Sequence, residues 1–230
     1  MSASGKISTL GVVILGAGAS SRMGRPKLLL PWRDTTVIGA ILRQWCELGA
    51  GQIAVVHRPN DEKLVEEIKR AEGRTGSPLP AVAQTNDSAH GVTRPTNVST
   101  HFIVNPKPEL GMFSSIVCAA NWPGWKTEIS NWVIALGDQP HLNSDTLRQF
   151  LVFHSAHAGA ICQPEFDGHM RHPVILQRAA FAELKSTTAA TLKDFLKQIP
   201  VPRVQCAVTD AGLALDMDTP DDYKRLTVSN

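Results

Sequence analysis

Two hydrophobic patterns alternate along the chain, and together they predict its secondary structure. Residues 10–15 (Leu-Gly-Val-Val-Ile-Leu), 53–56 (Ile-Ala-Val-Val) and 132–136 (Trp-Val-Ile-Ala-Leu) are short, continuous apolar runs. Runs of this length and composition are typical of strands buried on both faces of a sheet. We therefore predict three buried strands at these positions.

Helical spacing of apolar residues places helices between the strands. One helix is expected over residues 36–45, capped by Thr35 or Thr36, and a charged amphipathic helix over 60–71. Residues 72–80 are rich in Gly, Ser and Pro and are expected to form a loop. The other expected elements are strands at 81–83, 102–104, 160–162, 173–176, 204–208 and 213–217, and helices at 111–121, 145–157, 179–184, 190–199 and 220–226.

Strand and helix alternate in the first half of the chain, which predicts a parallel sheet covered by helices on both faces. The strands at 160–162 and 173–176 follow one another around a turn at Asp167-Gly168, which indicates one antiparallel insertion. The predicted fold class is therefore α/β, with three layers and a mostly parallel central sheet. Ligands bind such sheets outside the carboxyl ends of the strands, so residues that follow strands are the functional candidates.

The segment after the first strand has the composition of a phosphate site. Gly16, Gly18 and Gly24 are interleaved with small residues, and Arg22 and Lys27 add positive charge. Glycine permits close approach of a ligand to the backbone, and successive N–H groups in such a loop can surround an anion. We interpret this loop as a candidate polyphosphate site, the alternative being a glycine-rich surface loop with incidental charges.

Two familiar phosphate motifs do not fit this loop. A Walker A motif requires Ser or Thr after its lysine, whereas Leu28 follows Lys27. A dinucleotide fingerprint requires a third glycine where Ser21 stands, and Pro26 interrupts any helix close behind.

Residues 15–31 instead resemble the signature of the molybdenum-cofactor nucleotidyltransferase-like family, the MobA-like NTP transferases of molybdopterin cytidylyltransferase type. The loop matches this signature at nearly every position, with Gly16 where alanine is common. Three later segments support the resemblance and occur in the family's order: 111–115 (Gly-Met-Phe-Ser-Ser), 136–140 (Leu-Gly-Asp-Gln-Pro) and 216–220 (Asp-Met-Asp-Thr-Pro).

The resemblance implies a Rossmann-like nucleotidyltransferase fold in a single domain, residues 1–230. It also implies catalytic roles for three residues: Lys27 at the α-phosphate, Arg22 at the β- and γ-phosphates, and Asp138 at a metal. The nucleotide-binding residues it implies are Leu15, Gly16, Ala17, Gly18, Arg22, Lys27, Gly111, Met112, Ser114 and Ser115.

A triphosphate calls for a hard divalent cation, and Mg²⁺ prefers a few carboxylates together with water and phosphate oxygens. Asp138 follows a predicted strand and is the first candidate ligand. Asp216 and Asp218 alternate along an expected strand end, so both could face one side, and the family implies that they complete the site. Thr219 and Asp222 are expected to form a capping box for the last helix.

Arg171-His172-Pro173 stands where the family has Gly-His-Pro, so His172 and Arg171 are candidates for binding the acceptor. A structural, hydrogen-bonded histidine is the alternative at His172. Met112 and Phe113 could equally be core residues.

The implied reaction is transfer of CMP from CTP to molybdopterin with release of pyrophosphate. The cytidylyl branch of the family usually has alanine at the position of Ala17, where the guanylyl branch has glycine. The added methyl narrows the space beside the base and suits a pyrimidine. A guanylyltransferase using GTP, or an NTP transferase with another small phosphorylated acceptor, is the alternative.

Composition narrows the remaining functional classes. With 23 basic and 21 acidic residues the net charge is only +2, which gives no general attraction to nucleic acid or to a membrane. The four cysteines are far apart in sequence, so no zinc or redox motif is present and a reduced, cytoplasmic protein is expected. No apolar run approaches the ~20 residues that span a bilayer.

Two other classes remain open at this point. One is a dehydrogenase that binds NAD through the glycine loop, although Arg22, Lys27 and Asp138 favour a triphosphate with a metal. The other is a nucleotide-binding factor that matures a molybdenum enzyme without catalysis, whose motifs would look the same.

Overall fold

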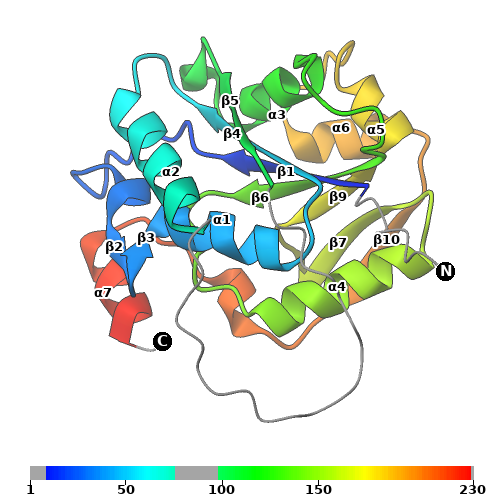
Figure 1. Ribbon diagram of the computed structural model, residues 1–230. Coiled ribbons are helices and arrows are strands. Elements are labelled where there is room, and N and C mark those ends of the chain that lie inside the picture. Colours follow the sequence, from blue (N-terminus) through cyan, green and yellow to red (C-terminus); the bar gives the residue numbers. More distant parts are fainter. Residues whose placement is uncertain (1–8, 76–97, 229–230) are drawn as a thin grey trace, which may run out of the picture.

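A single eight-stranded sheet organises the structure, a computed structural model that describes residues 9–75 and 98–228 (Figure 1). Its strands are β1 (Leu10–Leu15), β4 (Gln52–His57), β5 (Thr100–Val104), β6 (Asn131–Leu136), β7 (Ile161–Phe166), β8 (His169–Met170), β9 (Val174–Gln177) and β10 (Arg203–Ala207). The order is β10-β7-β9-β6-β1-β4-β5, with β8 paired to β7, and a separate hairpin joins β2 (Pro31–Trp32) to β3 (Thr35–Thr36).

The sheet is mostly parallel. Strand β1 lies between β4 and β6 and is parallel to both, and β4 is parallel to β5 in turn. Strand β9 is antiparallel to its neighbours β6 and β7, and β8 is antiparallel to β7. The expected antiparallel insertion is confirmed at this place, and so is the α/β fold class.

Helices cover both faces of the sheet and give three layers (Figure 1). They are α1 (Val37–Glu47), α2 (Glu62–Thr75), α3 (Met112–Asn121), α4 (Ser144–Ala156), α5 (Arg178–Glu183), α6 (Leu192–Gln198) and α7 (Pro220–Val228), with short 3₁₀ turns η1 (Lys27–Leu29), η2 (Pro108–Leu110) and η3 (Ala211–Ala214). Within the described residues, none of these helices has the length and apolar character needed to cross a membrane.

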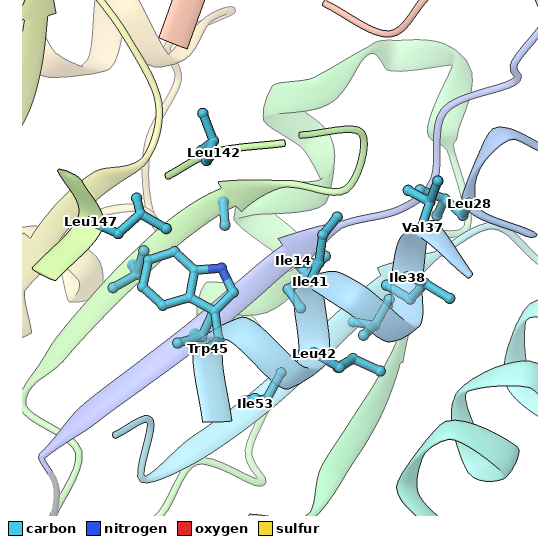
Figure 2. Close-up of a cluster of buried hydrophobic side chains, with 14 of the residues drawn as sticks. Ile14, Leu28, Val37, Ile38, Ile41, Leu42, Trp45, Ile53, Leu142 and Leu147 are labelled. Atoms are coloured by element: carbon cyan, nitrogen blue, oxygen red, sulfur yellow. The ribbon is translucent and has the colours of Figure 1, made fainter. Parts of the chain in front are cut away.

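Alternation along the buried strands divides the core into two clusters. Ile14 of β1 packs on the face covered by α1, α2 and α4, whereas Val13 faces α3, α5 and α6. Figure 2 shows the first cluster, where Ile14 lies close to Ile38, Ile41 and other apolar side chains of α1. Each fully buried side chain of this kind contributes roughly 1.5–3 kcal/mol of hydrophobic free energy, which fixes the strands that carry the loops.

Two sequence predictions about secondary structure are wrong. Residues 213–217 do not form a strand, because η3 and an extended segment without strand pairing occupy this region. The second helix runs to Thr75, so residues 72–75 are helical and not part of the loop expected over 72–80. The strand expected at 81–83 lies outside the described residues.

The carboxyl ends of β1, β4, β5 and β6 lie at one edge of the sheet, since these strands are parallel. Gly137 follows β6 at this edge, and its N–H donates to the Leu15 carbonyl at 3.1 Å. A Cβ atom at position 137 would lie 2.6 Å from that same carbonyl oxygen, so only glycine lets the two strand ends approach this closely.

Replacing Gly137 with Ala should therefore push the end of β6 away from β1. We expect the free energy of unfolding to fall by about 1–3 kcal/mol, as for other overpacked positions. Urea unfolding followed by circular dichroism measures this, with Gly18→Ala as the control because a Cβ there has no neighbour within 4 Å. Equal losses in the two variants would show that the close approach at Gly137 is not required.

Candidate active site

A cavity of about 580 Å³ lies at the carboxyl edge of the parallel strands, next to the glycine loop. It is lined by the loop after β1, by η1, by the residues that directly follow β4 and β6, and by η2 and the start of α3. The lining residues are 15–20, 27–28, 58–59, 108–109, 111–112, 115 and 136–138. The predicted nucleotide residues Leu15, Gly16, Ala17, Gly18, Lys27, Gly111, Met112 and Ser115 are all among them, whereas Arg22 and Ser114 are not.

The glycines of the loop meet different needs. Gly16 donates its N–H to the Val56 carbonyl at 2.8 Å, and a Cβ there would lie 3.1 Å from the same oxygen, so the loop begins tightly against β4. Gly24 has φ of +69°, a conformation that favours glycine. The chain then turns back, and the Lys27 N–H donates to Ser20 Oγ at 3.3 Å. This return brings the Lys27 side chain to the cavity.

Lys27 lies at the centre of a charged network that joins distant parts of the chain. Its ammonium group donates to the Asp138 carboxylate and, at 3.2 Å, to Asp218 Oδ1. Arg22 donates to the other oxygen of Asp218 at 2.7 Å. Burial lowers the pKa of Lys27, but the charges and hydrogen bonds of Asp138 and then Asp218 outweigh it and leave the pKa raised. The ammonium group is therefore held in its charged form.

A third carboxylate, Asp216, belongs to the same neighbourhood. Its pKa is raised by burial and then by the negative charges of Asp138 and Asp218, with partial compensation from Lys27 and Arg171. Three carboxylates thus lie close enough to influence one another, with Lys27, Arg22 and Arg171 supplying positive charge beside them.

Asp138 and Asp218 could hold a divalent metal ion. Both offer hard carboxylate oxygens, the ligand type that Mg²⁺ and Mn²⁺ accept. In the ranges 9–75 and 98–228, however, no three metal-ligating side chains are already gathered into one site. A metal here would need phosphate oxygens and water to complete its coordination, and Lys27 would have to release a carboxylate.

The segment that carries Asp216 and Asp218 is fixed by its neighbours rather than by sheet pairing. Met217 between them is fully buried. Thr219 Oγ1 accepts the Asp222 N–H at 3.2 Å, and the Asp222 carboxylate accepts the Thr219 N–H at 3.0 Å. This confirms the predicted capping box of α7, which anchors Asp218 directly before the helix.

The amino end of α3 closes another side of the cavity. Gly111 has φ of +87°, which sets the direction of the helix start. Met112 lines the cavity and is 45% exposed, while Phe113 is buried in the core. Phe113 is therefore a core residue, and a contact between Met112 and the nucleotide stays a prediction. The Asn105 amide donates to Ser114 Oγ at 2.8 Å and to Ser115 Oγ at 2.9 Å.

Arg171 and His172 lie just before β9, on the side of Asp138 away from the glycine loop, and neither lines the cavity. His172 Nδ1 is 3.3 Å from the Ile134 carbonyl, and burial lowers its pKa more than that bond and the charges of Asp138 and Asp216 raise it. His172 thus makes a structural hydrogen bond. Binding of the acceptor by His172 or Arg171 stays a prediction.

Sequence reasoning missed two charged residues of the cavity, Arg58 and Glu109. Arg58 follows β4 directly, so the rule that ligands bind at strand carboxyl ends could have found it. Glu109 lies in the short turn η2 after β5, for which no periodicity was visible.

Comparison with known proteins identifies the family. The model of the MobA-like NTP transferase domain matches residues 12–204. The molybdenum cofactor cytidylyltransferase of Escherichia coli (strain K12) is 23% identical over 218 residues, which cover 94% of this chain and 95% of that protein.

Solved structures share the fold over nearly the whole chain. Rv0371c from Mycobacterium tuberculosis, in complex with manganese, aligns with a TM-score of 0.59 and 23% identity over 97% of this chain and 100% of that one. Molybdopterin-guanine dinucleotide biosynthesis protein A from Archaeoglobus fulgidus aligns with a TM-score of 0.62 and 16% identity over 95% and 97%. At these identities the likeness establishes the fold.

Replacing Lys27 with Met tests the charged network. Asp138 and Asp218 would lose their shared cation, so we expect the free energy of unfolding at neutral pH to fall by about 1–3 kcal/mol. The folded-state pKa of Asp216 lies above its unfolded value, so the folded protein binds more protons, and stability falls as pH rises between these two pKa values. Without the positive charge of Lys27, the folded-state pKa of Asp216 rises further. The loss in free energy of unfolding in Lys27→Met should therefore be smaller near pH ~4 than at neutral pH.

Urea unfolding at the two pH values measures both effects. Arg22→Met is the control, because the Arg22 side chain is 69% exposed and its ion pair contributes little. A Lys27→Met protein as stable as the wild type at neutral pH would contradict a stabilising role for the network.

Proposed function

Because the chain belongs to the MobA-like NTP transferase family, we propose that it transfers CMP from CTP to a small phosphorylated acceptor, molybdopterin, and releases pyrophosphate. The observation that carries this proposal is the Lys27–Asp138–Asp218 network beside a glycine loop in one cavity. The cytidylyl and molybdopterin parts rest on the similarity to the Escherichia coli cytidylyltransferase and on the loop sequence.

In the proposed reaction an acceptor phosphate oxygen attacks the α-phosphorus of CTP. The new P–O bond forms as the bond from the α-phosphorus to the α–β bridging oxygen breaks, and that oxygen leaves with pyrophosphate. Catalysis of this kind consists of positioning and of neutralising the charge that develops. The loop N–H groups and Lys27 supply both at the α-phosphate, and Arg22 stands farther out for the β- and γ-phosphates.

Lys27 is central because it already carries its proton and is already held at the cavity wall. When the triphosphate enters, its oxygens compete with Asp138 and Asp218 for the ammonium group. We propose that Lys27 exchanges these carboxylates for phosphate oxygens, which frees the carboxylates at the moment the nucleotide is bound.

The freed carboxylates are the proposed ligands of Mg²⁺, with Asp138 first, Asp218 next and Asp216 third. The donor set fits the ion, since all three side chains are carboxylates, and burial together with the negative charges of Asp138 and Asp218 raises the pKa of Asp216. The manganese complex of the Mycobacterium tuberculosis protein supports a divalent metal in this fold. When bound, the ion supplies positive charge to the phosphates and the leaving group.

We place the acceptor on the β9 side of Asp138, near Arg171 and His172. Arg171 contributes positive charge close to Asp216, and a phosphorylated acceptor would meet it there. His172, held neutral by burial and bonded to the Ile134 carbonyl, would shape this region rather than transfer a proton.

Ala17 supports CTP over GTP. It lines the cavity and is 7% exposed, so its methyl group occupies space that a larger base would need. A guanylyltransferase activity is the second candidate for this chain, because the Archaeoglobus fulgidus protein of the same fold is named for the guanine dinucleotide.

Replacing Asp138 with Asn tests the enzyme assignment. We expect pyrophosphate release with CTP, Mg²⁺ and molybdopterin to fall by at least ~10²-fold, because a carboxylate for the metal is lost. Asp34→Asn is the control, since Asp34 pairs with Arg43 at the surface, away from the cavity. Unchanged turnover in Asp138→Asn would contradict metal-assisted transfer, and tight NADH binding without NTP binding would favour a dehydrogenase.

Competition between CTP and GTP in one reaction tests the base. A single methyl group at Ala17 limits discrimination from sterics to ~10–200-fold, and we expect a preference for CTP within that range. Product analysis by mass spectrometry measures the ratio, and Ala17→Gly should reduce it. A preference of the wild type for GTP would reassign the base and leave the transfer chemistry in place.

A further inference from the structure

The charged side chains of the cavity fall into two pairs with different states. Lys27 and Asp138 bind each other. Arg58 and Glu109 also line the cavity, but neither forms an ion pair with another residue in the part of the chain that the structure describes. The Arg58 guanidinium makes one long contact, 3.4 Å from Nη2 to the Ala17 carbonyl oxygen. The cavity therefore has one end where Lys27 and Asp138 pair with each other, and another end where the half-buried Arg58 and the exposed Glu109 form no ion pair with a described residue.

Strand order separates the two ends. Asp138 follows β6, and Arg58 follows β4, with β1 and its glycine loop between them. Glu109 follows β5, one strand farther from β6. A nucleotide with its α-phosphate at Lys27 would extend along this edge and place its other end near Arg58 and Glu109.

We propose that Arg58 and Glu109 recognise the base of the nucleotide by hydrogen bonds to its polar edge. This inference rests on the proposed function and adds the residues that read the base. Cytosine presents two adjacent acceptors, O2 and N3, and one donor, the exocyclic amine. A guanidinium group offers parallel N–H donors and a carboxylate offers acceptors, so Arg58 and Glu109 together match that edge.

The same pair disfavours uracil. Uracil carries a proton on N3 and an oxygen in place of the exocyclic amine. Its N3–H donor would therefore face the donors of Arg58, and its O4 acceptor would face the carboxylate of Glu109. Arg58 is half-buried and Glu109 is exposed, so uracil would lose these charge-assisted hydrogen bonds and place like partners opposite each other. On this proposal Arg58 and Glu109 favour CTP over UTP, a preference that the methyl group of Ala17 cannot provide.

Arg58 could instead bind phosphate. It also lines a neighbouring hollow of about 420 Å³ on the outer side of the glycine loop, where a triphosphate tail could run. Glu109 favours the base, because a carboxylate that faces the same cavity would repel phosphate oxygens. The experiment has to separate these two roles.

Isothermal titration with CTP, UTP and inorganic tripolyphosphate, each with Mg²⁺, makes that separation without an acceptor or turnover. For Arg58→Ala we expect CTP affinity to fall ~10–100-fold, as for a lost charge-assisted hydrogen bond, while tripolyphosphate affinity stays unchanged. Arg58→Lys should keep tripolyphosphate binding and still lose CTP affinity, because an ammonium group lacks the planar pair of donors. Glu109→Gln should narrow the preference for CTP over UTP, since an amide can donate to the uracil oxygen.

Arg25→Ala is the matched control. It removes the same charge close to the loop. Arg25 lies over the Tyr223 ring and lines the neighbouring hollow together with Arg58, but it does not line the cavity, so Arg25→Ala should leave the affinity for CTP relative to tripolyphosphate unchanged. Equal losses for CTP and tripolyphosphate in Arg58→Ala, or full CTP affinity in that variant, would overturn the proposal. If the wild type binds GTP instead of CTP, the base assigned under the proposed function fails, and the Arg58 contact is then judged by the same comparison of GTP with tripolyphosphate.

Discussion

The ammonium group of Lys27, held between the carboxylates of Asp138 and Asp218, is the interaction on which this site depends. It joins the loop after β1 to the end of β6 and to the segment before α7. Such a contact between distant parts of the chain is possible because parallel strands end at the same edge of the sheet. The two core clusters fix those strands from both faces, and Gly137 lets β1 and β6 end close together.

The network also explains how one site can receive both a polyanion and a cation. Lys27 is kept charged by the carboxylates, and the carboxylates are kept close by Lys27. If triphosphate and metal entered together, phosphate oxygens would replace the carboxylates at Lys27, and the metal ion would replace Lys27 at the carboxylates. The site is thus organised before the substrate arrives, with its charges satisfied internally at one end and open at Arg58 and Glu109.

Much of the fold could be predicted from the sequence because buried parallel strands read as continuous apolar runs. β1, β4 and β6 were found in this way, and the glycine loop was found from its composition. The strand predicted at 213–217 was wrong. Leu213 and Met217 are buried, as they would be in a strand, but no neighbouring strand pairs with this segment. Asp216 and Asp218 nevertheless lie near Asp138. Met217 between them points into the core, so the side chains on either side of it point the other way, toward the cavity edge. Arg58 and Glu109 were missed because a single charged residue after a strand looks like an ordinary solvated one until the strand order is known.

We propose that Lys27 exchanges its carboxylates for phosphate oxygens when the nucleotide binds. A crystal structure of the protein with a non-hydrolysable CTP analogue and Mg²⁺ measures this most directly. We expect the Lys27 ammonium group at the α-phosphate, the metal ion on Asp138, and the base beside Arg58 and Glu109. A bound analogue with Lys27 still held between Asp138 and Asp218, and with its phosphates elsewhere, would contradict it.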